Sequence, residues 1–586
     1  MVPVRALFGR AKARVLDDLR TDPYLPALLV LAAVLSGFWF WHRLPNVATR
    51  DEWSRALDPL VAFRSVVADP SFEGLKQGVA WGRVPFGATF YLFALALVPM
   101  IAVAVLTGNL DAITGTPHIS WAFGHFPIWN EVPAWFWTGY IGLVRLFNVA
   151  FAVGSVYLTY RIATTIADRS TGRLAALFLT LTFGFLTIAH EGGEDMPALF
   201  FLLVALYLLI LFVRSGETWT FYAASAVGGV AMAFKLTMAV VIALIALAHV
   251  LRAREREAWP RSLYRPRLIG IGAALGLLAI VVGLPTTLVG AFDPVLSRIG
   301  GHSISRPGNP HGPTAPTWWW FARGYFNGLG LPLLVGSVGG LVAALSRVGR
   351  RRANTGTLLV LATIGGFAAL YVPWHDFRVH HLLPTFPLLA ILVATWLVEL
   401  RDRRETVARV LTVALIVSSG VYAGVGVAGY ADTPRDQAAA WLDDRVRENE
   451  TIETYRWHFQ DTALPHGANV TYKEGEFTAC PEYIMLTYRD LVYLDGTYLR
   501  NSPRRQAYIR GLLDGESGYE IVAEFGSRPP AYFPQRPTPG SLVDLLPYGI
   551  VPQVDQHADE QELRPNQFTV ILQSTGECDA DRDPPF

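Results

Sequence analysis

Charge and cysteine are scarce in this sequence of 586 residues. Charged residues account for 17% of the chain and hydrophobic residues for 52%, and the mean hydropathy is +0.32. This composition excludes an ordinary soluble protein of this length. The two cysteines, Cys480 and Cys578, are too few for a disulfide-rich framework. We expect one disulfide if this part of the chain is extracellular, and two buried thiols are an equally good interpretation.

Long apolar runs recur between residues 25 and 430 and are missing after that. A run of about 18 or more apolar residues is typical of a membrane span. The first run, LPALLVLAAVLSGFWFWHRL, follows a basic leader and has no small-residue cleavage site, so we expect a retained span. The sequence therefore predicts a polytopic bundle of about 11–13 transmembrane helices over residues 1–430. Residues 431–586 are expected to form a soluble α/β or α+β domain.

The net charge of +1 conceals two halves of opposite sign. From residue 431 onward there are 14 basic and 26 acidic residues, whereas the preceding part has 35 basic and 22 acidic ones. The basic residues gather in short loops, as they do on the cytoplasmic side of membrane proteins. An even number of crossings must separate these loops, and we count eleven crossings in all. The N-terminus is then cytoplasmic, and the acidic tail lies outside the plasma membrane.

This topology makes residues 45–136 a large first external loop. One run inside it, PFGATFYLFALALVPMIAVAVLT (85–107), is long enough to cross the membrane. A single crossing there would turn every later basic loop to the outside. We therefore interpret it as interfacial or re-entrant, or as one of a pair of spans.

Ionisable residues of both signs converge on the predicted external face. The acidic ones are Asp51, Glu52, Glu191, Glu194 and Asp195, and the basic ones are Arg145, Lys235, Arg378, His380 and His381. The loop 291–325 adds Arg298, His302, Arg306, His311 and the run Trp318–Trp320, which we interpret as an interfacial anchor rather than a sugar platform. Charges are costly where membrane meets water, so their convergence predicts a functional site. Lys235 is the strongest candidate, because it is one of four lysines in the chain and interrupts an apolar run.

Five segments, in order, resemble the GT-C glycosyltransferases of the protein O-mannosyltransferase and aminoarabinose transferase type. They are the Asp51-Glu52 pair in NVATRDEWSRALDP, LVRLFNVAFAVGSVYLTYRIA with Arg145, HEGGEDMPALFFLLVALYLL, GGVAMAFKLTMAVV with Lys235, and DFRVHHLLPTFPLLAILVA with Arg378. The resemblance covers residues 25–430. One departure is the pair His380-His381, where an aromatic residue is usual in the family.

The resemblance implies that one sugar, most commonly mannose in this family, passes from a polyprenyl-phosphate carrier to an external glycan, protein or lipid. A lipid-linked donor also suits a chain that has no Gly-rich nucleotide loop. Cations must meet the leaving phosphate, and we expect this of Lys235, Arg378, Arg145 and His381. Asp51 and Glu52 are the expected catalytic residues. Asp51 would act as general base, Glu52 would hold the acceptor or a cation, and direct displacement would invert the anomeric carbon.

Three further residues, Glu194, Asp195 and His380, are expected to line the cavity for the acceptor or sugar, with Glu191 facing water. Three carboxylates could also bind a divalent cation. The family divides on metals and the sequence shows no dedicated ligand spacing, so we assign no metal. No nucleic-acid partner is expected.

Two other functions fit parts of the sequence. A transporter or flippase of lipid-linked glycans would use the same carboxylates and Lys235 as an ion relay, but a relay should extend through both leaflets. An oligosaccharyl transferase would carry a Trp-Trp-Asp-type signature, whereas the segment WWWFARG lacks the acid. The one-sided placement of the charges favours the glycosyltransferase.

Overall fold

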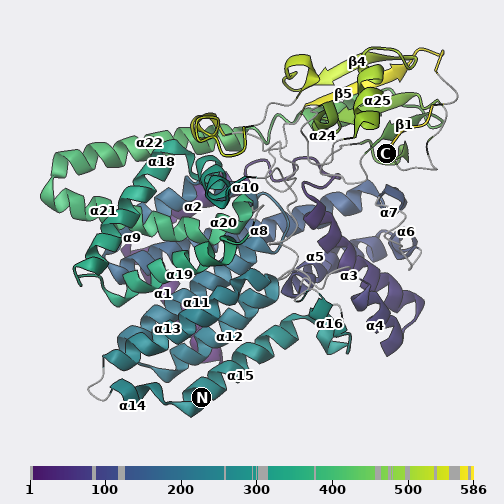
Figure 1. Ribbon diagram of the computed structural model, residues 1–586. Helices are drawn as coiled ribbons and strands as arrows, with labels where there is room; N and C mark the ends of the chain where they lie inside the picture. The colour runs from purple at the N-terminus through teal and green to yellow at the C-terminus, as the bar shows by residue number, and fades with distance from the viewer. Residues whose placement is uncertain are drawn as a thin grey trace.

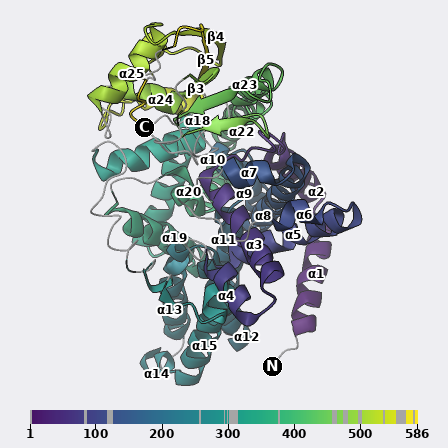
Figure 2. The same ribbon diagram turned by 90° about the vertical axis from the view of Figure 1, so that its right-hand side faces the viewer.

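A computed structural model shows a helical domain with a small sheet domain at one end, and the N-terminus lies at the other end (Figures 1 and 2). The structure describes residues 4–81, 87–115, 126–255, 259–293, 295–297, 300, 315–374, 378–455, 464–472, 477, 480–494, 502–533, 537–552, 568–578 and 582–586.

Helices account for nearly all of the described chain up to residue 430. They are α1 (Val4–Thr21), α2 (Leu25–Gly37), α3 (Arg50–Ala68), α4 (Phe72–Ala80), α5 (Ala88–Leu106), α6 (Leu110–Thr114), α7 (Phe126–Glu131), α8 (Ala134–Ile166), α9 (Arg169–Thr180), α10 (Phe183–Ala189) and α11 (Asp195–Ser215). The series continues with α12 (Thr218–Phe234), α13 (Val240–Arg254), α14 (Trp259–Leu263), α15 (Pro266–Gly283), α16 (Pro285–Leu288), α18 (Thr317–Gly349), α19 (Thr355–Tyr371), α20 (Val379–Leu382), α21 (Phe386–Arg403) and α22 (Glu405–Ala428).

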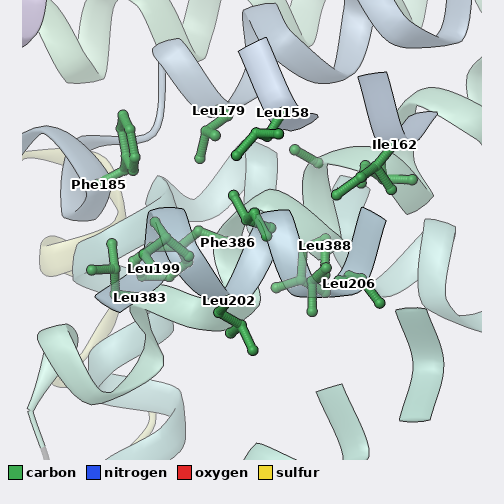
Figure 3. Packing of buried hydrophobic residues seen from close by; sticks show 14 of the residues in the cluster. Leu158, Ile162, Leu179, Phe185, Leu199, Leu202, Leu206, Leu383, Phe386 and Leu388 are labelled. Atoms are coloured by element: carbon green, nitrogen blue, oxygen red, sulfur yellow. The ribbon is translucent and has the colours of Figure 1, made fainter. Parts of the chain in front are cut away.

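The bundle has buried central helices and peripheral helices with an exposed apolar surface. Nearly every residue of α21 from Phe386 to Leu397 is buried, so this helix is apolar all round because protein surrounds it. Only Leu268 and Gly272 of α15 are buried, and its remaining apolar surface is available to lipid. The core lies where α8, α9, α10, α11 and α21 meet (Figure 3).

Among the described residues, eight helices are long and apolar enough to cross a membrane, or ten if each of two bent pairs counts as one span. The two bends are 105° between α1 and α2 and 64° between α9 and α10. Helices α12 and α19 have 17 residues each, at the short end of the length that a span needs.

The described residues of the predicted first external loop form five helices, α3 to α7. Its apolar run forms α5, a 19-residue helix that meets the length and composition of a span. Tyr91 in its first turn donates a hydrogen bond to the carbonyl of Val282 at the end of α15, at 2.7 Å. Further along, Phe93 packs edge-on against Tyr140 of α8.

The C-terminal domain is a mixed five-stranded sheet with helices, which confirms the prediction of a mixed domain. Its elements are β1 (Thr451–Thr454), β2 (Asn469–Thr471), β3 (Tyr483–Thr487), β4 (Tyr519–Phe525), β5 (Thr569–Ser574), α23 (Pro434–Asp443), α24 (Tyr488–Leu491), α25 (Pro503–Leu513) and α26 (Leu546–Ile550). The strand order is β2-β1-β3-β5-β4. Strand β1 is parallel to β2 and β3, whereas β5 is antiparallel to β3 and β4. Cys480 and Cys578 form a disulfide across this domain.

The two domains share contacts that fix the sheet domain over the start of α3 and α8. Apolar side chains from both domains form one buried cluster around Trp129, Tyr140 and Ile452. Asn46 exchanges two hydrogen bonds with the backbone of Leu464, of 3.1 and 3.4 Å. This end of the bundle is therefore covered by folded chain.

Candidate functional site

The Asp-Glu pair lies in the first turn of α3. Thr49 caps the helix, and its hydroxyl accepts a hydrogen bond from the N–H of Glu52 at 3.1 Å. Acidic side chains in a first turn also interact favourably with the helix dipole. The two carboxylates diverge from there: the Asp51 side chain is 35% exposed, whereas that of Glu52 is fully buried.

The Glu52 carboxylate is completely occupied by protein groups. Arg145 of α8 donates to its two oxygens from Nε at 2.7 Å and Nη2 at 2.8 Å. The backbone N–H groups of Ala48 and Gly192 donate to the same oxygens at 2.6 and 2.8 Å. A side chain at Gly192 would approach Glu52 Oε1 to 3.0 Å, so glycine allows this backbone contact. We conclude that Glu52 joins three segments of the chain.

The rest of the Arg145 guanidinium is also engaged. Its Nη1 donates to the carbonyl oxygens of Phe40 at 2.8 Å and His42 at 2.7 Å, and the side chain has no exposed surface. These contacts do not favour the expected role of Arg145 as a ligand of the donor phosphate. A phosphate could reach it only by breaking a buried ion pair, which costs about 3–5 kcal/mol.

Arg55 links the acidic hairpin to α3, a role that the sequence analysis missed. Its guanidinium donates two hydrogen bonds to Glu194, both of 3.2 Å, and lies 3.7 Å from Asp51. Asp51 and Arg55 are four residues apart and so share one face of the helix. That spacing was the one available signal, because Glu194 is 139 residues away.

Lys235 ends α12 and pairs with Asp195, the first residue of α11. Its backbone is extended (φ −147°, ψ 119°), so the helix stops there. The Lys235 ammonium donates to Asp195 Oδ1. The two side chains are 13% and 16% exposed, so this pair is mostly buried but keeps some contact with solvent.

A small polar pocket collects the acidic residues. It is lined by Thr49, Asp51, Asn148, Ile188, Glu191, Gly192, Gly193, Glu194, Asp195 and His380. Its volume is about 10 Å³, room for about one water molecule. Glu191, which was expected to face water, belongs to this lining and is half-buried. Asn148, one helical turn after Arg145, was also missed, and it donates to the carbonyl of Glu191.

The remaining predicted residues lie on α20 and just before it. His380 reaches the pocket, whereas His381 packs its ring at 5.4 Å from Tyr371 and 5.2 Å from Trp374. The backbone N–H of Arg378 donates to His381 Nδ1 at 2.9 Å, which leaves the other ring nitrogen, Nε2, to carry a proton. The Arg378 side chain is half-buried at the start of this helix.

A second pair of histidines, His42 and His190, lies next to the site. The ring of His190 stacks on Tyr430 with 4.0 Å between centroids, and its nitrogens lie 2.7 Å from the carbonyl oxygen of Leu186 and 2.8 Å from that of Phe38. Burial lowers the pKa of His190 to about 4, although these hydrogen bonds oppose the shift. Burial, with the nearby Arg145, also holds the pKa of His42 well below its usual value. Both shifts favour the neutral ring at pH 7, in which the single N–H of His190 donates to one of its two carbonyl oxygens.

The aromatic run does not act as the predicted anchor. Trp319 and Trp320 are buried, and only Trp318 is half exposed. The Trp319 indole donates to the carbonyl of Ser541 in the sheet domain at 3.1 Å, so it joins the two domains. Four loop residues named above, Arg298, His302, Arg306 and His311, lie outside the described residues. Within the described ranges, no group of three His, Cys, Asp or Glu residues could hold a metal ion.

Comparison with known proteins agrees with the family resemblance. The family model described as dolichyl-phosphate-mannose-protein mannosyltransferase matches residues 134–284. This part of the chain is therefore similar to that family. The matched segment begins with α8 and ends one residue after α15, so it includes Arg145, Asp195 and Lys235 but not Asp51. No curated protein matches the sequence.

Solved structures with a similar fold are distant in sequence. The apo oligosaccharyltransferase of Archaeoglobus fulgidus is 10% identical with a TM-score of 0.50, and the match covers 95% of this chain and 89% of that one. AglB of the same organism, in complex with an inhibitory peptide and a dolichol-phosphate, is 11% identical with a TM-score of 0.51, covering 94% and 88%. ArnT from Cupriavidus metallidurans bound to undecaprenyl phosphate is 12% identical with a TM-score of 0.47, covering 75% and 85%. The chain has the GT-C fold.

Proposed function

We propose that this protein transfers a single sugar, mannose in the first instance, from a dolichyl or polyprenyl phosphate to an extracytoplasmic glycan, protein or lipid. One observation carries the proposal: Asp51 and Asp195 line one pocket, and Asp195 forms an ion pair with Lys235. Support also comes from the family match and from the dolichol-phosphate in the complex of the similarly folded AglB.

Asp51 is the proposed general base. Its carboxylate lines the pocket and is partly exposed, so an acceptor hydroxyl can approach it. A hydroxyl needs such a base because its pKa lies far above neutrality. As Asp51 takes the proton, the acceptor oxygen bonds to the anomeric carbon and the bond from that carbon to the phosphate oxygen breaks. Attack opposite the phosphate inverts the anomeric configuration.

Lys235 is the proposed partner of the leaving phosphate. The ammonium group has three N–H donors, so it can keep its contact with Asp195 and still donate to a phosphate oxygen. This charge counters the negative charge that develops as the bond breaks. Arg378 and the His381 Nε2–H are proposed as further phosphate contacts, since both belong to the segment that also brings His380 to the pocket.

Glu52 and Arg145 act as positioning residues in this account. Their ion pair fixes the first turn of α3 to α8, and with it the direction of Asp51. Arg55 and Glu194 do the same between α3 and the hairpin before α11. These two buried ion pairs hold the start of α3, and with it Asp51, in place. A general base needs such a fixed position because it must lie within hydrogen-bond distance of the acceptor hydroxyl.

A transporter fits the charge distribution less well. The 18 residues of α11 that follow Asp195, from Met196 to Val213, contain no acidic or basic side chain. Helix α11 also has a buried face along this length. An ion relay would need polar steps along such a central helix.

Mass spectrometry of surface glycoproteins from cells with and without this protein tests the proposal. We expect deletion to remove one hexose from the terminal position of the glycan, and wild-type protein to restore it. Unchanged glycans would refute the proposed activity, and loss of a pentose would refute mannose as the sugar.

A further inference from the structure

A large apolar groove lies at the end of the bundle opposite the candidate site. It is bounded by α2, α9, α21 and α22 and has a volume of about 550 Å³, within the range typical of ligand-binding pockets. Its walls are mainly leucine and valine side chains, among them Leu28, Leu177 and Val413. We propose that this groove binds an anionic glycerophospholipid of the adjacent leaflet, independently of the sugar-transfer function proposed above.

Three arginines give the groove a charged rim. Arg173, Arg401 and Arg409 all line it, each from a different helix. A site with apolar walls and arginines at its mouth matches a lipid, whose chains are apolar and whose phosphate carries the charge. Arginine is well suited to this contact because its planar guanidinium binds phosphate through two N–H groups.

Two of these arginines can bind a headgroup. The Arg401 and Arg409 side chains are 50% and 75% exposed, and their carboxylate partners, Asp402 and Glu405, are 72% and 64% exposed. Exposed pairs of this kind contribute little free energy, so a phosphate can compete for the arginines.

Arg173 has a structural role in the groove, unlike Arg401 and Arg409, because its side chain is fixed in place. Its Nε lies 2.9 Å from both oxygens of the buried Asp22, and its guanidinium stacks 4.6 Å over the ring of Tyr24. Asp22 lies at the 105° bend between α1 and α2, and the hydroxyl of Tyr160 also donates to it at 2.8 Å. The bend therefore holds one wall of the groove in a fixed shape without any lipid.

The groove lies too far from the candidate site for its ligand to be the sugar donor. Helix α21 begins beside α20, which reaches the candidate pocket, and Arg401 lies in its last turn. The 15 residues between Phe386 and Arg401 correspond to about 22 Å along the helix at 1.5 Å per residue. A lipid whose phosphate meets Arg401 is therefore too far away to present a sugar to Asp51.

Native mass spectrometry of the full chain in neutral detergent, titrated with phosphatidylglycerol or phosphatidylcholine, tests the proposal. We expect the wild type to bind phosphatidylglycerol in preference to phosphatidylcholine. The double variant Arg401→Gln/Arg409→Gln should bind it roughly 30-fold more weakly, the effect of losing two arginine contacts near a membrane surface. Arg403→Gln is the matched control, because Arg403 lies on the same exposed helix end but not in the lining.

A second variant tests the walls. Leu177→Trp should reduce binding of phosphatidylglycerol by filling the groove while all three arginines remain. If this variant does not fold, the exposed arginine variants still decide the question. Equal binding of the two lipids, undiminished binding by the double variant, or displacement of phosphatidylglycerol by an equimolar amount of polyprenyl phosphate would each overturn the proposal.

Discussion

Glu52 and Arg145 are joined by two hydrogen bonds, of 2.7 and 2.8 Å, between side chains that are both fully buried. The pair connects α3 to α8 across 93 residues of sequence. Removing one partner of a buried ion pair leaves an uncompensated charge, whereas the intact pair contributes little net stability. The Glu52–Arg145 ion pair is therefore expected to matter for the folding of the site rather than directly for the reaction.

Glu52→Gln should destabilise the protein by about 3–5 kcal/mol, because Arg145 would keep its charge without a carboxylate. Thermal unfolding in detergent or nanodiscs measures this. The matched control is Glu73→Gln, whose side chain is 58% exposed beside Lys76 and should change stability by less than about 0.5 kcal/mol. Normal stability of Glu52→Gln, together with lost transfer, would instead make Glu52 a group that acts in the reaction.

Lys235→Met should abolish transfer by removing the cation that meets the donor phosphate. The single substitution also leaves Asp195 without its ammonium partner, so a stability effect is expected. The double variant Lys235→Met/Asp195→Asn removes both charges and should recover stability while transfer stays lost. Transfer restored in the double variant would show that Lys235 only compensates Asp195.

The stability of the fold should decrease as the pH falls from about 6.5 toward 4. The pKa of His190 is about 4 in the folded protein, and its ordinary value is about 6.5. Unfolded chains thus bind the proton first, which favours unfolding within this window, and full stability is present above it. In His190→Gln, the slope of unfolding free energy against pH should decrease by up to about 1.4 kcal/mol per pH unit. An unchanged slope would mean that the His190 ring is already protonated in the fold.

The disulfide should matter to the sheet domain and not to the bundle. Cys480 and Cys578 are separated by 98 residues, and closing so long a loop typically stabilises a protein by about 2–4 kcal/mol. The variant Cys480→Ser/Cys578→Ser should become more sensitive to protease within residues 431–586, measured as cleavage half-life. Equal half-lives with and without the pair would indicate that the two thiols are not bonded in the native protein.

Much of the architecture follows from the sequence because a membrane imposes simple rules. Apolar runs and basic loops identify the helical part and the mixed soluble domain, since spans must be long and apolar. The run 85–107 is a segment whose position these rules do not predict. It forms one helix of the expected length, but its packing against α8 depends on tertiary contacts that no local pattern specifies.

The residues of the candidate site could be chosen from the sequence by their type, but the contacts between them could not be predicted. The isolation of Lys235 in an apolar run predicts a functional residue, and the structure brings it to Asp195, while its contact with the donor phosphate stays a prediction. Arg145 looked equally suited to a phosphate, because an arginine early in a span gives no sign of its partner. Its partner Glu52 is 93 residues away, and only the fold decides that the two meet.

The most direct test of the account is transfer by Asp51→Asn in proteoliposomes with radiolabelled polyprenyl-phosphate mannose. The amide keeps the size of the carboxylate but cannot take a proton. We expect wild-type folding, unchanged binding of the donor, and transfer slower by ~10²–10⁴, the usual effect of losing a general base. Asp111→Asn, at an exposed position on α6, is the control and should transfer normally. Full transfer by Asp51→Asn would contradict the account, because the site would then lie elsewhere in the molecule.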